Sequence, residues 1–491
     1  MEFEWNTILI EILKILLGIL VSGIVAAFVL FIKENFVWRL IKPRYSSYKN
    51  DPFARETIKY RFNSIISNLI KGLSNNKNAI SYKEFQDTLL DNIDFTSSAA
   101  LHTDINDQNQ ELMSLWLASL PSFQNHTISH FLTNSRFIDS EYLFYYYILD
   151  KLGSLDVENK RKLHPDYKEG AQFDPYRIEK LNLLERDFTN DIGEKKGSKY
   201  NSKIKQCLDF INRVNSHMDD NVWKKLMFTS PNSLLHTNLS SNSSDLSQMF
   251  WSNFNSVYPH IDDSKKFWDE FLHDVGGKNI NIIVDNFGIE FLNDLVLGYC
   301  LKKKGIGTIT YHVKQLPIFV SDVIENDHIL LFNALEDLIN KSNELDPDKK
   351  NSYLNALKQL KQTANDSFIF KTNYFWNMPF GFAQLQPGAL DIKGVRTSQV
   401  INEAYSIFNS SDLLIVKGDL NYRRLVEDKL WHIKSSTSKK IKYVKSPLLI
   451  IRSYKSNIVM DCKKSEISEL EAKYGPDWKT EGRVGSIIFR K

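Results

Sequence analysis

The chain has 491 residues, enough for more than one domain and a large hydrophobic core. Its apolar content of 42% and charged content of 25% are those of a globular protein and exclude a disordered chain. A formal net charge of +3 argues against a nucleic-acid partner, because such proteins present a strongly basic surface. The three cysteines lie far apart, which argues against a disulfide framework and fits a reducing compartment.

The first predicted element is the uncharged run "ILLGILVSGIVAAFVLFI", from Ile15 to Ile32. It reaches the ~18 residues that suggest a spanning helix. Basic residues follow the run, so the positive-inside rule places the rest of the chain in the cytoplasm. We therefore predict a membrane anchor over residues 1–45 and a single-pass membrane protein whose bulk is cytoplasmic. Gly18, Ser22 and Ala26 share one face of this helix, which raises the hypothesis of a homodimer.

Residues 46–247 are predicted to be mostly helical. The stretch "ETIKYRFNSIISNLIKGL", residues 56–73, has apolar side chains close to the helical period. The aromatic-rich stretch "EYLFYYYILDKL", residues 141–152, is apolar all round, as expected of a buried helix. The region ends in the Ser/Asn-rich stretch "HTNLSSNSSDLS", from His236 to Ser247, which we interpret as a loop or hinge.

Residues 248–491 alternate short β-branched runs with helical segments, a pattern typical of a parallel sheet with crossover helices. The predicted strands are Ile280–Val284, Ile306–Val313, Ile318–Val320, Leu413–Val416, Leu448–Ile451 and Ser486–Phe489. The predicted helices are Gly288–Lys304, Asp327–Glu344 and Val400–Phe408. The fold class is thus a doubly wound, mostly parallel sheet of Rossmann-like α/β/α type, preceded by the helical region and one transmembrane helix. Ligands of such sheets bind outside the carboxyl ends of the strands.

Polar side chains stand at several of these strand ends. Asp285 and Asn286 follow the first predicted strand, and Asp322 follows the third. Neighbouring residues of a strand face opposite sides, so Asp285 and Asn286 can reach one ion only if the chain bends there, which Gly288 permits. Two carboxylates and an amide oxygen form a hard ligand set suited to Mg²⁺ or Mn²⁺. Asp285 judged alone is slightly more typical of a helix cap than of a metal ligand.

Arg452 and Lys455, after the fifth predicted strand, would supply the positive charge that a bound phosphate needs, although they could also be surface cations. Glu290 and Asp294 follow the candidate ligands on a predicted helix, where a solvated face or a supporting role is expected. The chain has no P-loop, zinc-protease or nucleophile-elbow motif.

The segments "VDNFGIEFLNDL", "LPIFVSDV", "LLIVKGDLNYRRL" and "IIRSYK" occur in this order. Together they resemble the metal-dependent damage-control phosphatase family, in the branch also described as acidic-residue (protein-glutamate) methyltransferase-like. The resemblance is strong over residues 279–491 and faint over about 46–247. The branch's Arg-Thr-x-Lys motif stands here as "RSYK", with a serine in place of the threonine.

The resemblance implies a divalent metal, Mn²⁺, Mg²⁺ or Ni²⁺, and assigns residues to it and to the substrate. The implied metal ligands are Asp285, Asn286 and Asp322, and the implied substrate contacts are Asp419, Asn421 and Lys455, which Arg452 would assist. Glu141 and the tyrosines near it match the branch's helical motif only in part, because its tryptophans and arginines are missing.

We therefore predict a membrane-anchored, metal-dependent phosphatase that hydrolyses small phosphorylated metabolites, with sugar phosphates implied by the resemblance. Asp285, Asn286 and Lys455 would form its catalytic centre. Two alternatives remain open at this point. One is an S-adenosylmethionine-dependent protein carboxyl methyltransferase, for which the chain shows no glycine-rich cofactor loop. The other is a non-catalytic sensor of a phosphorylated metabolite at the membrane.

Overall fold

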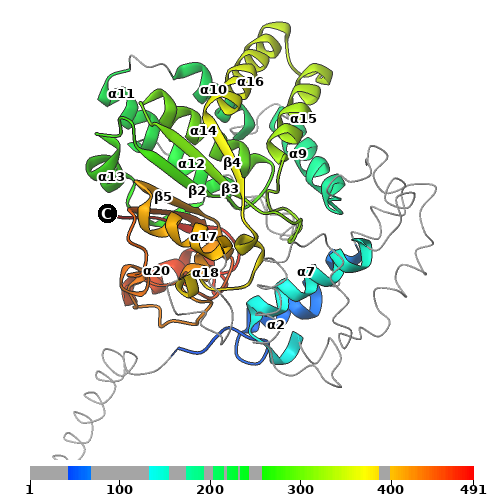
Figure 1. Ribbon diagram of the computed structural model, residues 1–491, viewed down its shortest axis with the longest axis vertical. Coiled ribbons are helices and arrows are strands. Elements are labelled where there is room, and N and C mark those ends of the chain that lie inside the picture. The colour runs from blue at the N-terminus through cyan, green and yellow to red at the C-terminus, as the bar shows by residue number, and fades with distance from the viewer. Residues whose placement is uncertain are drawn as a thin grey trace, which may run out of the picture.

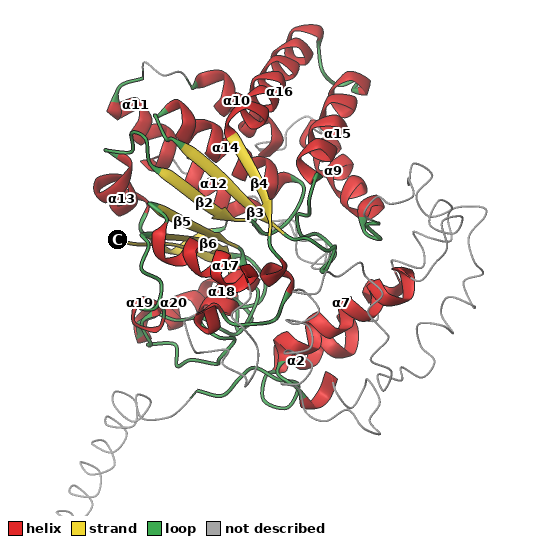
Figure 2. Ribbon diagram, in the orientation of Figure 1, coloured by secondary structure: helices red, strands yellow, loops and turns green. Residues whose placement is uncertain are grey.

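A seven-stranded sheet lies at the centre of the computed structural model (Figures 1 and 2). The structure describes residues 43–62, 64–67, 132–153, 173–192, 203–214, 218–229, 233–242, 257–385 and 399–491. The strands are β1 (Tyr258–Asp262), β2 (Asn279–Ile283), β3 (Thr308–Val313), β4 (Phe368–Thr372), β5 (Leu413–Lys417), β6 (Leu448–Ser453) and β7 (Val484–Arg490).

The strand order is β1-β7-β6-β5-β2-β3-β4. Every neighbouring pair is parallel except β6 and β7, which are antiparallel. The chain extends the sheet from β2 to β3 and β4 on one side, and from β5 to β6 on the other. The point between β2 and β5 is therefore a topological switch point, where open α/β sheets bind their ligands.

Helices cover both faces of the sheet (Figure 2). Those before β2 are α2 (Pro52–Glu56), η2 (Thr57–Arg61), α7 (Phe137–Gly153), α9 (Arg177–Ile192), α10 (Lys203–Arg213), α11 (Asp220–Lys224), η3 (Lys225–Thr229), α12 (Leu234–Ser241), α13 (Ser264–Phe267) and η5 (Trp268–Leu272). Those after β2 are α14 (Ile289–Lys303), α15 (Asp327–Lys341), α16 (Pro347–Ser367), η6 (Tyr374–Asn377), η7 (Phe382–Leu385), α17 (Gln399–Ser410), α18 (Asp419–Leu425), α19 (Thr437–Lys440) and α20 (Lys464–Tyr474).

The central strands are apolar on both sides, because each side packs against a separate hydrophobic cluster. Every residue of β5 and β6 is buried. In β5, Leu413 and Ile415 join the cluster formed with α10, α12, α14 and α16. Leu414 and Val416 join the other cluster, with α7 and α17. This two-sided burial confirms the mixed α/β fold with a mostly parallel sheet that the sequence predicts.

The predicted strands differ from the observed ones in two respects. β1 and β4 were not predicted, because they are the edge strands of the sheet and carry polar or exposed residues. The run Ile318–Val320, predicted as a strand, lies in the loop after β3. Phe319 adopts a positive φ of 67° there, and its ring packs against Tyr142 and Tyr145 of α7 with centroids 5.0 and 4.5 Å apart. Burial of this apolar run beneath a helix replaces the strand pairing.

The prediction of a single-pass membrane protein is corrected here. Within the parts of the chain that the structure describes, no helix is both long enough and apolar enough to cross a bilayer. α16, of 21 residues, is long enough but carries lysines and aspartates along its length. The run Ile15–Ile32 and the small residues of the dimer hypothesis lie outside the described residues.

The Ser/Asn-rich stretch that begins at His236 was predicted to be a loop, but its described part forms α12 and the helix cap Asn242. Nearly all of α12 is buried, and it packs against α14, β6 and β7. Its serines and asparagines are accommodated because their side chains make hydrogen bonds inside the protein. The predicted boundary between residues 247 and 248 stays a prediction.

Candidate active site

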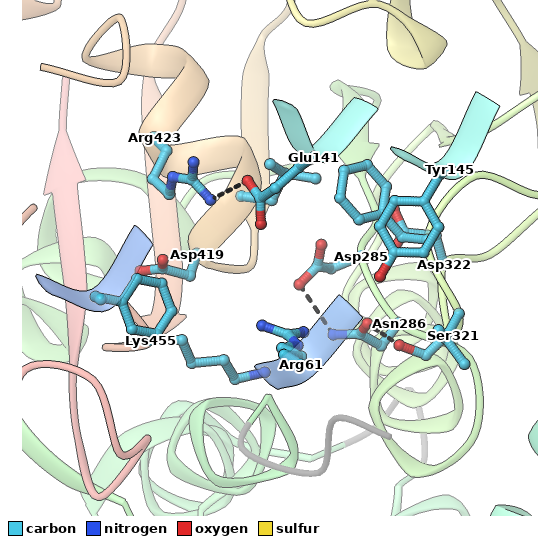
Figure 3. Close-up of a pocket in the computed structure, with 14 residues that line it drawn as sticks. Arg61, Glu141, Tyr145, Asp285, Asn286, Ser321, Asp322, Asp419, Arg423 and Lys455 are labelled. Atoms are coloured by element: carbon cyan, nitrogen blue, oxygen red, sulfur yellow. Dashed lines mark hydrogen bonds and ion pairs between the residues drawn. The ribbon is translucent and has the colours of Figure 1, made fainter. Parts of the chain in front are cut away.

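The loops after β2, β3, β5 and β6 meet at the switch point and, with two segments of the N-terminal region, enclose a cavity of about 60 Å³ (Figure 3). Such a volume holds a few water molecules. The residues that line it are Phe53, Arg61, Glu141, Tyr145, Asp285, Asn286, Phe319, Val320, Ser321, Asp322, Asp419, Leu420, Arg423 and Lys455.

Asp285 and Asn286 face the same cavity because the chain leaves the strand before reaching them. β2 ends at Ile283, and Gly288 takes a φ of 88° where the chain turns into α14. The bend that the sequence predicts at Gly288 is confirmed, since this backbone conformation is open mainly to glycine. Asn286 also forms an isolated antiparallel bridge with Asp322, which holds the two loops together.

Gly418 is required for the position of the Asp285 carboxylate. It lies between β5 and α18 with a φ of 85°. A Cβ atom at residue 418 would lie 1.9 Å from Oδ2 and 2.1 Å from Cγ of Asp285. The glycine of "KGDLNY" therefore provides the space into which the carboxylate fits.

Asp322 comes from the loop after β3 and not from a strand of its own. Its carboxylate is buried and forms a close ion pair with the ammonium of Lys314, which directly follows β3. Lys314 also lies 4.2 Å from the centroid of the Phe319 ring. Sequence reasoning missed Lys314, although its place at a strand end is the signal that identified the other residues.

The environment of Asp285 disfavours its charged form in the absence of a cation. Burial raises the pKa of Asp285 well above its usual value, and the nearby carboxylates of Glu290 and Asp322 raise it further. Lys455 and Lys314 oppose this shift. A divalent cation between the two aspartates would relieve the repulsion that the lysines only partly offset.

The donor set fits a hard divalent metal. Asp285 and Asp322 provide carboxylate oxygens, and Asn286 provides an amide oxygen. This oxygen accepts a hydrogen bond from Ser321 Oγ at 2.6 Å and has a second lone pair available. No group of three or more His, Cys, Asp or Glu side chains arranged to hold a metal occurs in the described ranges, so a site here depends on the amide.

Glu290 and Asp294 are fully buried, which excludes the solvated face that the sequence left open. Lys417, also fully buried, contacts Asp294 Oδ1 at 2.7 Å and Glu290 Oε1 at 3.7 Å. Burial raises the pKa of Asp294 to about 7 against the opposing effect of Lys417. Glu290 accepts a hydrogen bond from Asn286 Nδ2 at 3.0 Å and so supports a candidate ligand directly, whereas the Asp294 carboxylate contacts Lys417.

The predicted substrate residues occupy two kinds of position. Lys455 and Asp419 line the cavity. Arg452 lies outside the lining, stacked on the rings of Tyr422 and Tyr454 at 3.8 and 4.6 Å. Its Nη2 lies 3.2 Å from Asp419 Oδ1. Arg452 therefore fixes the position of Asp419 and does not itself line the cavity.

Asn421 is also placed outside the cavity lining. Its Nδ2 donates to the carbonyl oxygens of Val284 and Lys417, at 3.1 and 2.9 Å. The side chain therefore ties the end of β2 to the end of β5. Direct substrate contact by Asn421 or Arg452 stays a prediction, whereas their structural contacts explain why these residue types stand there.

The wall of the cavity opposite the candidate metal ligands comes from the N-terminal region. Of this wall, only Glu141 and the tyrosines near it were identified from the sequence. Glu141 of α7 accepts a hydrogen bond from Arg423 Nη1 at 2.7 Å, and Arg423 Nε donates to Asp428 at 2.8 Å. Burial raises the pKa of Glu141, while Arg423 and Arg61 oppose the shift. Neither Arg61 nor Arg423 was predicted from the sequence as a site residue, although both lie in segments quoted above.

A family model described as the damage-control phosphatase ARMT1-like domain matches residues 201–470, more than half of the chain. The chain belongs to this family. The ARMT1-like match begins well before the predicted α/β domain and includes α10, α12 and the whole cluster of candidate ligands. The family predicted from the sequence motifs is therefore confirmed.

Curated relatives of this ARMT1-like chain include the damage-control phosphatases ARMT1 of Danio rerio, Mus musculus and Homo sapiens. The first is 26% identical over 238 residues, 47% of this chain and 48% of the relative. The mouse and human proteins are 28% and 25% identical over 212 residues, 43% of each chain. The alignments thus span about half the length of these relatives.

Among solved structures, a DUF89 family protein from Pyrococcus horikoshii is 14% identical, and the comparison covers 74% of this chain and 92% of that one. The TM-score is 0.26, too low to support a conclusion about either fold or site.

Proposed function

We propose that the chain is a metal-dependent phosphatase that hydrolyses phosphomonoesters, with sugar phosphates or related damaged phosphometabolites as substrates. The observation that supports this most is the convergence of Asp285, Asn286, Asp322 and Lys455 in one buried cavity at the switch point. Membership in the damage-control phosphatase family supports the same chemistry.

In the proposed reaction, Asp285, Asn286 and Asp322 would hold the divalent metal. A metal held there would act as a Lewis acid toward a phosphoryl oxygen and would lower the pKa of a bound water. Lys455 would neutralise the charge that collects on the equatorial phosphoryl oxygens in the transition state. The lysine is 7% exposed, so its charge is only weakly screened by solvent.

The remaining polar groups of the cavity suit the hydroxyls of a substrate. Asp419 and Glu141 can each accept a hydrogen bond from a hydroxyl, and both are held by an arginine, Arg452 and Arg423 respectively. Because these arginines fix the two carboxylates in advance, little side-chain entropy would be lost when the substrate binds.

The test is a screen of phosphate release from a panel of phosphomonoesters with Mn²⁺, Mg²⁺, Ni²⁺ or a chelator. Asp285→Asn should lower the metal-dependent rate by more than about 100-fold, because losing groups that merely orient a ligand already costs ~10–100-fold. Asp337→Asn, an exposed aspartate of α15, is the matched control and should keep full activity. Full activity of Asp285→Asn would refute the site assignment. Methyl transfer from S-adenosylmethionine without metal-dependent phosphate release would favour the methyltransferase alternative instead.

A further inference from the structure

Asn242, at the C-terminal end of α12, lies behind the candidate metal ligands and is fully buried. Its Nδ2 donates to Glu290 Oε1 at 2.6 Å and lies 3.4 Å from Asp285 Oδ2. The amide thus contacts a candidate ligand and the glutamate that supports it. The contact with Glu290 is the shorter and therefore the stronger of the two.

The other side of the same amide is bound to β6. Asn242 Oδ1 accepts from the backbone N–H of Ser453 at 2.6 Å and from Ser453 Oγ at 3.0 Å. The carbonyl oxygen of Asn242 also lies 3.1 Å from Ser453 Oγ. Ser453 is the last residue of β6 and precedes Lys455 by two positions. One side chain therefore joins the Asp285 loop to the strand end that presents Lys455.

α12 is itself fixed in place, so it can act as a rigid support. Asn238 Nδ2 donates to the carbonyl oxygen of Asn293 in α14 at 3.0 Å, and Asn238 Oδ1 accepts from the buried ammonium of Lys417. At the start of the helix, His236 Nε2 lies 2.7 Å from Asp262 Oδ2 in β1. These contacts attach α12 to α14, β5 and β1, so Asn242 has little freedom to move.

We propose that Asn242 is a positioning residue that sets the distance between the metal and the phosphate-binding lysine. The inference rests on the proposed function, because it takes Asp285 as a metal ligand and Lys455 as a phosphate contact. The site needs an amide because one end must donate to carboxylates while the other accepts from a backbone N–H. An aspartate would lack the donor and add a negative charge beside Asp285 and Glu290.

The test compares two buried asparagines that are changed to an apolar residue of similar shape. Asn242→Leu should lower kcat by about 10–100-fold and raise the Kd for Mn²⁺ about tenfold, the usual effect of losing a group that orients a ligand. Asn293→Leu is the control, because Asn293 is equally buried but its side-chain amide bonds to Cys207 Sγ and the Ile289 carbonyl, not to Asp285 or Glu290. The substitution keeps the backbone carbonyl that accepts from Asn238. Its melting temperature should fall similarly, while kcat and the Mn²⁺ Kd stay near those of the wild type.

Titration calorimetry with Mn²⁺ separates this inference from the proposed function. If the wild type binds Mn²⁺ but releases no phosphate from any substrate, weaker Mn²⁺ binding by Asn242→Leu still supports the positioning role. Wild-type Mn²⁺ affinity and kcat in Asn242→Leu would refute it, as would equal losses in Asn293→Leu or a wild type that binds no divalent ion.

If Asn242→Leu does not fold, Ser453→Ala takes its place. This change removes the hydroxyl that donates to Asn242 but keeps the backbone N–H. It should lower kcat about fivefold, as expected for one hydrogen bond. Unchanged kcat and Mn²⁺ affinity in a folded Ser453→Ala would then refute the proposal.

Discussion

Gly418→Ala should move the Asp285 carboxylate without changing any polar group of the site. The added methyl would lie 1.9 Å from Asp285 Oδ2 in the present conformation, well inside van der Waals contact. The carboxylate would have to rotate away, and its hydrogen bond from Asn286 Nδ2, now 3.0 Å long, would be lost. The two aspartates could then no longer share an ion.

The substitution has two separate costs. A non-glycine residue at a φ of 85° and a ψ of 162° is strained, at about 1–3 kcal/mol. The displaced carboxylate should in addition weaken Mn²⁺ binding by at least ~10–100-fold, since loss of mere orientation already has that effect. We therefore expect a moderate loss of thermal stability together with a near-complete loss of metal-dependent phosphate release.

Gly475→Ala provides the matched control. Gly475 has a φ of 87° and a ψ of 174°, so alanine there is strained to a similar degree. No heavy atom lies within 4 Å of its added Cβ, and the residue ends α20, away from the cavity. Thermal unfolding, Mn²⁺ titration and phosphate release should be measured for both variants. If Gly418→Ala binds Mn²⁺ as tightly as Gly475→Ala does, the close fit of Gly418 against Asp285 is not required for the metal site.

Three further predictions concern the rest of the cavity and α12. Lys455→Met should reduce phosphate release more than about 100-fold while Mn²⁺ still binds, because it removes a charge that acts on the phosphoryl group; unaltered kcat in steady-state kinetics would exclude that role. Glu141→Gln should raise KM about tenfold with little change in Mn²⁺ affinity, because it weakens a hydroxyl acceptor on the wall opposite the metal ligands; a large change in the Mn²⁺ Kd would contradict this division. For Asp262, burial raises the pKa, but hydrogen bonds from His236 and Ser264 outweigh it and lower the pKa to about 2, from 3.8. Its stabilising contribution is therefore present above about pH 4 and is lost as the pH falls toward 2; because the side chain is 35% exposed, we expect only about 1 kcal/mol. Unfolding of the wild type and Asp262→Asn in urea should differ at pH 6 and converge near pH 2, and a difference that persists at pH 2 would refute the assignment.

The part of the site that the sequence predicts is the part that follows buried central strands. β5 and β6 begin with apolar runs of four residues that are buried on both sides, and β2 ends in buried isoleucines. The ends of these strands, and Asp285, Asp419 and Lys455 beyond them, could therefore be located. β1 and β4 are edge strands, so β1 carries polar residues and β4 leaves Ile369 exposed.

The residues that sequence reasoning missed act through tertiary contacts. Asn242 lies in a Ser/Asn-rich stretch whose composition indicates a loop, and only its partners Glu290 and Ser453 explain its place in the core. Arg61 comes to the cavity from a segment far away in sequence, as does Glu141, which the sequence motifs matched only in part. Local sequence patterns cannot predict such contacts, because the contacts depend on how the N-terminal helices pack against the sheet.

The balance of charge around the cavity supports the proposed cation beside Asp285. Three acids there have a basic partner within 4 Å: Asp322 with Lys314, Glu141 with Arg423, and Asp419 with Arg452. Across the described ranges, the carboxylate of Asp285 forms no such ion pair, and its hydrogen-bond donors are the neutral side-chain amides of Asn242 and Asn286. A buried carboxylate with no ion-pair partner either takes up a proton or binds a cation. Because Asp322 and the side chain of Asn286 line the same cavity as Asp285, and Lys455 lies at the cavity wall, we infer that a metal supplies the remaining positive charge.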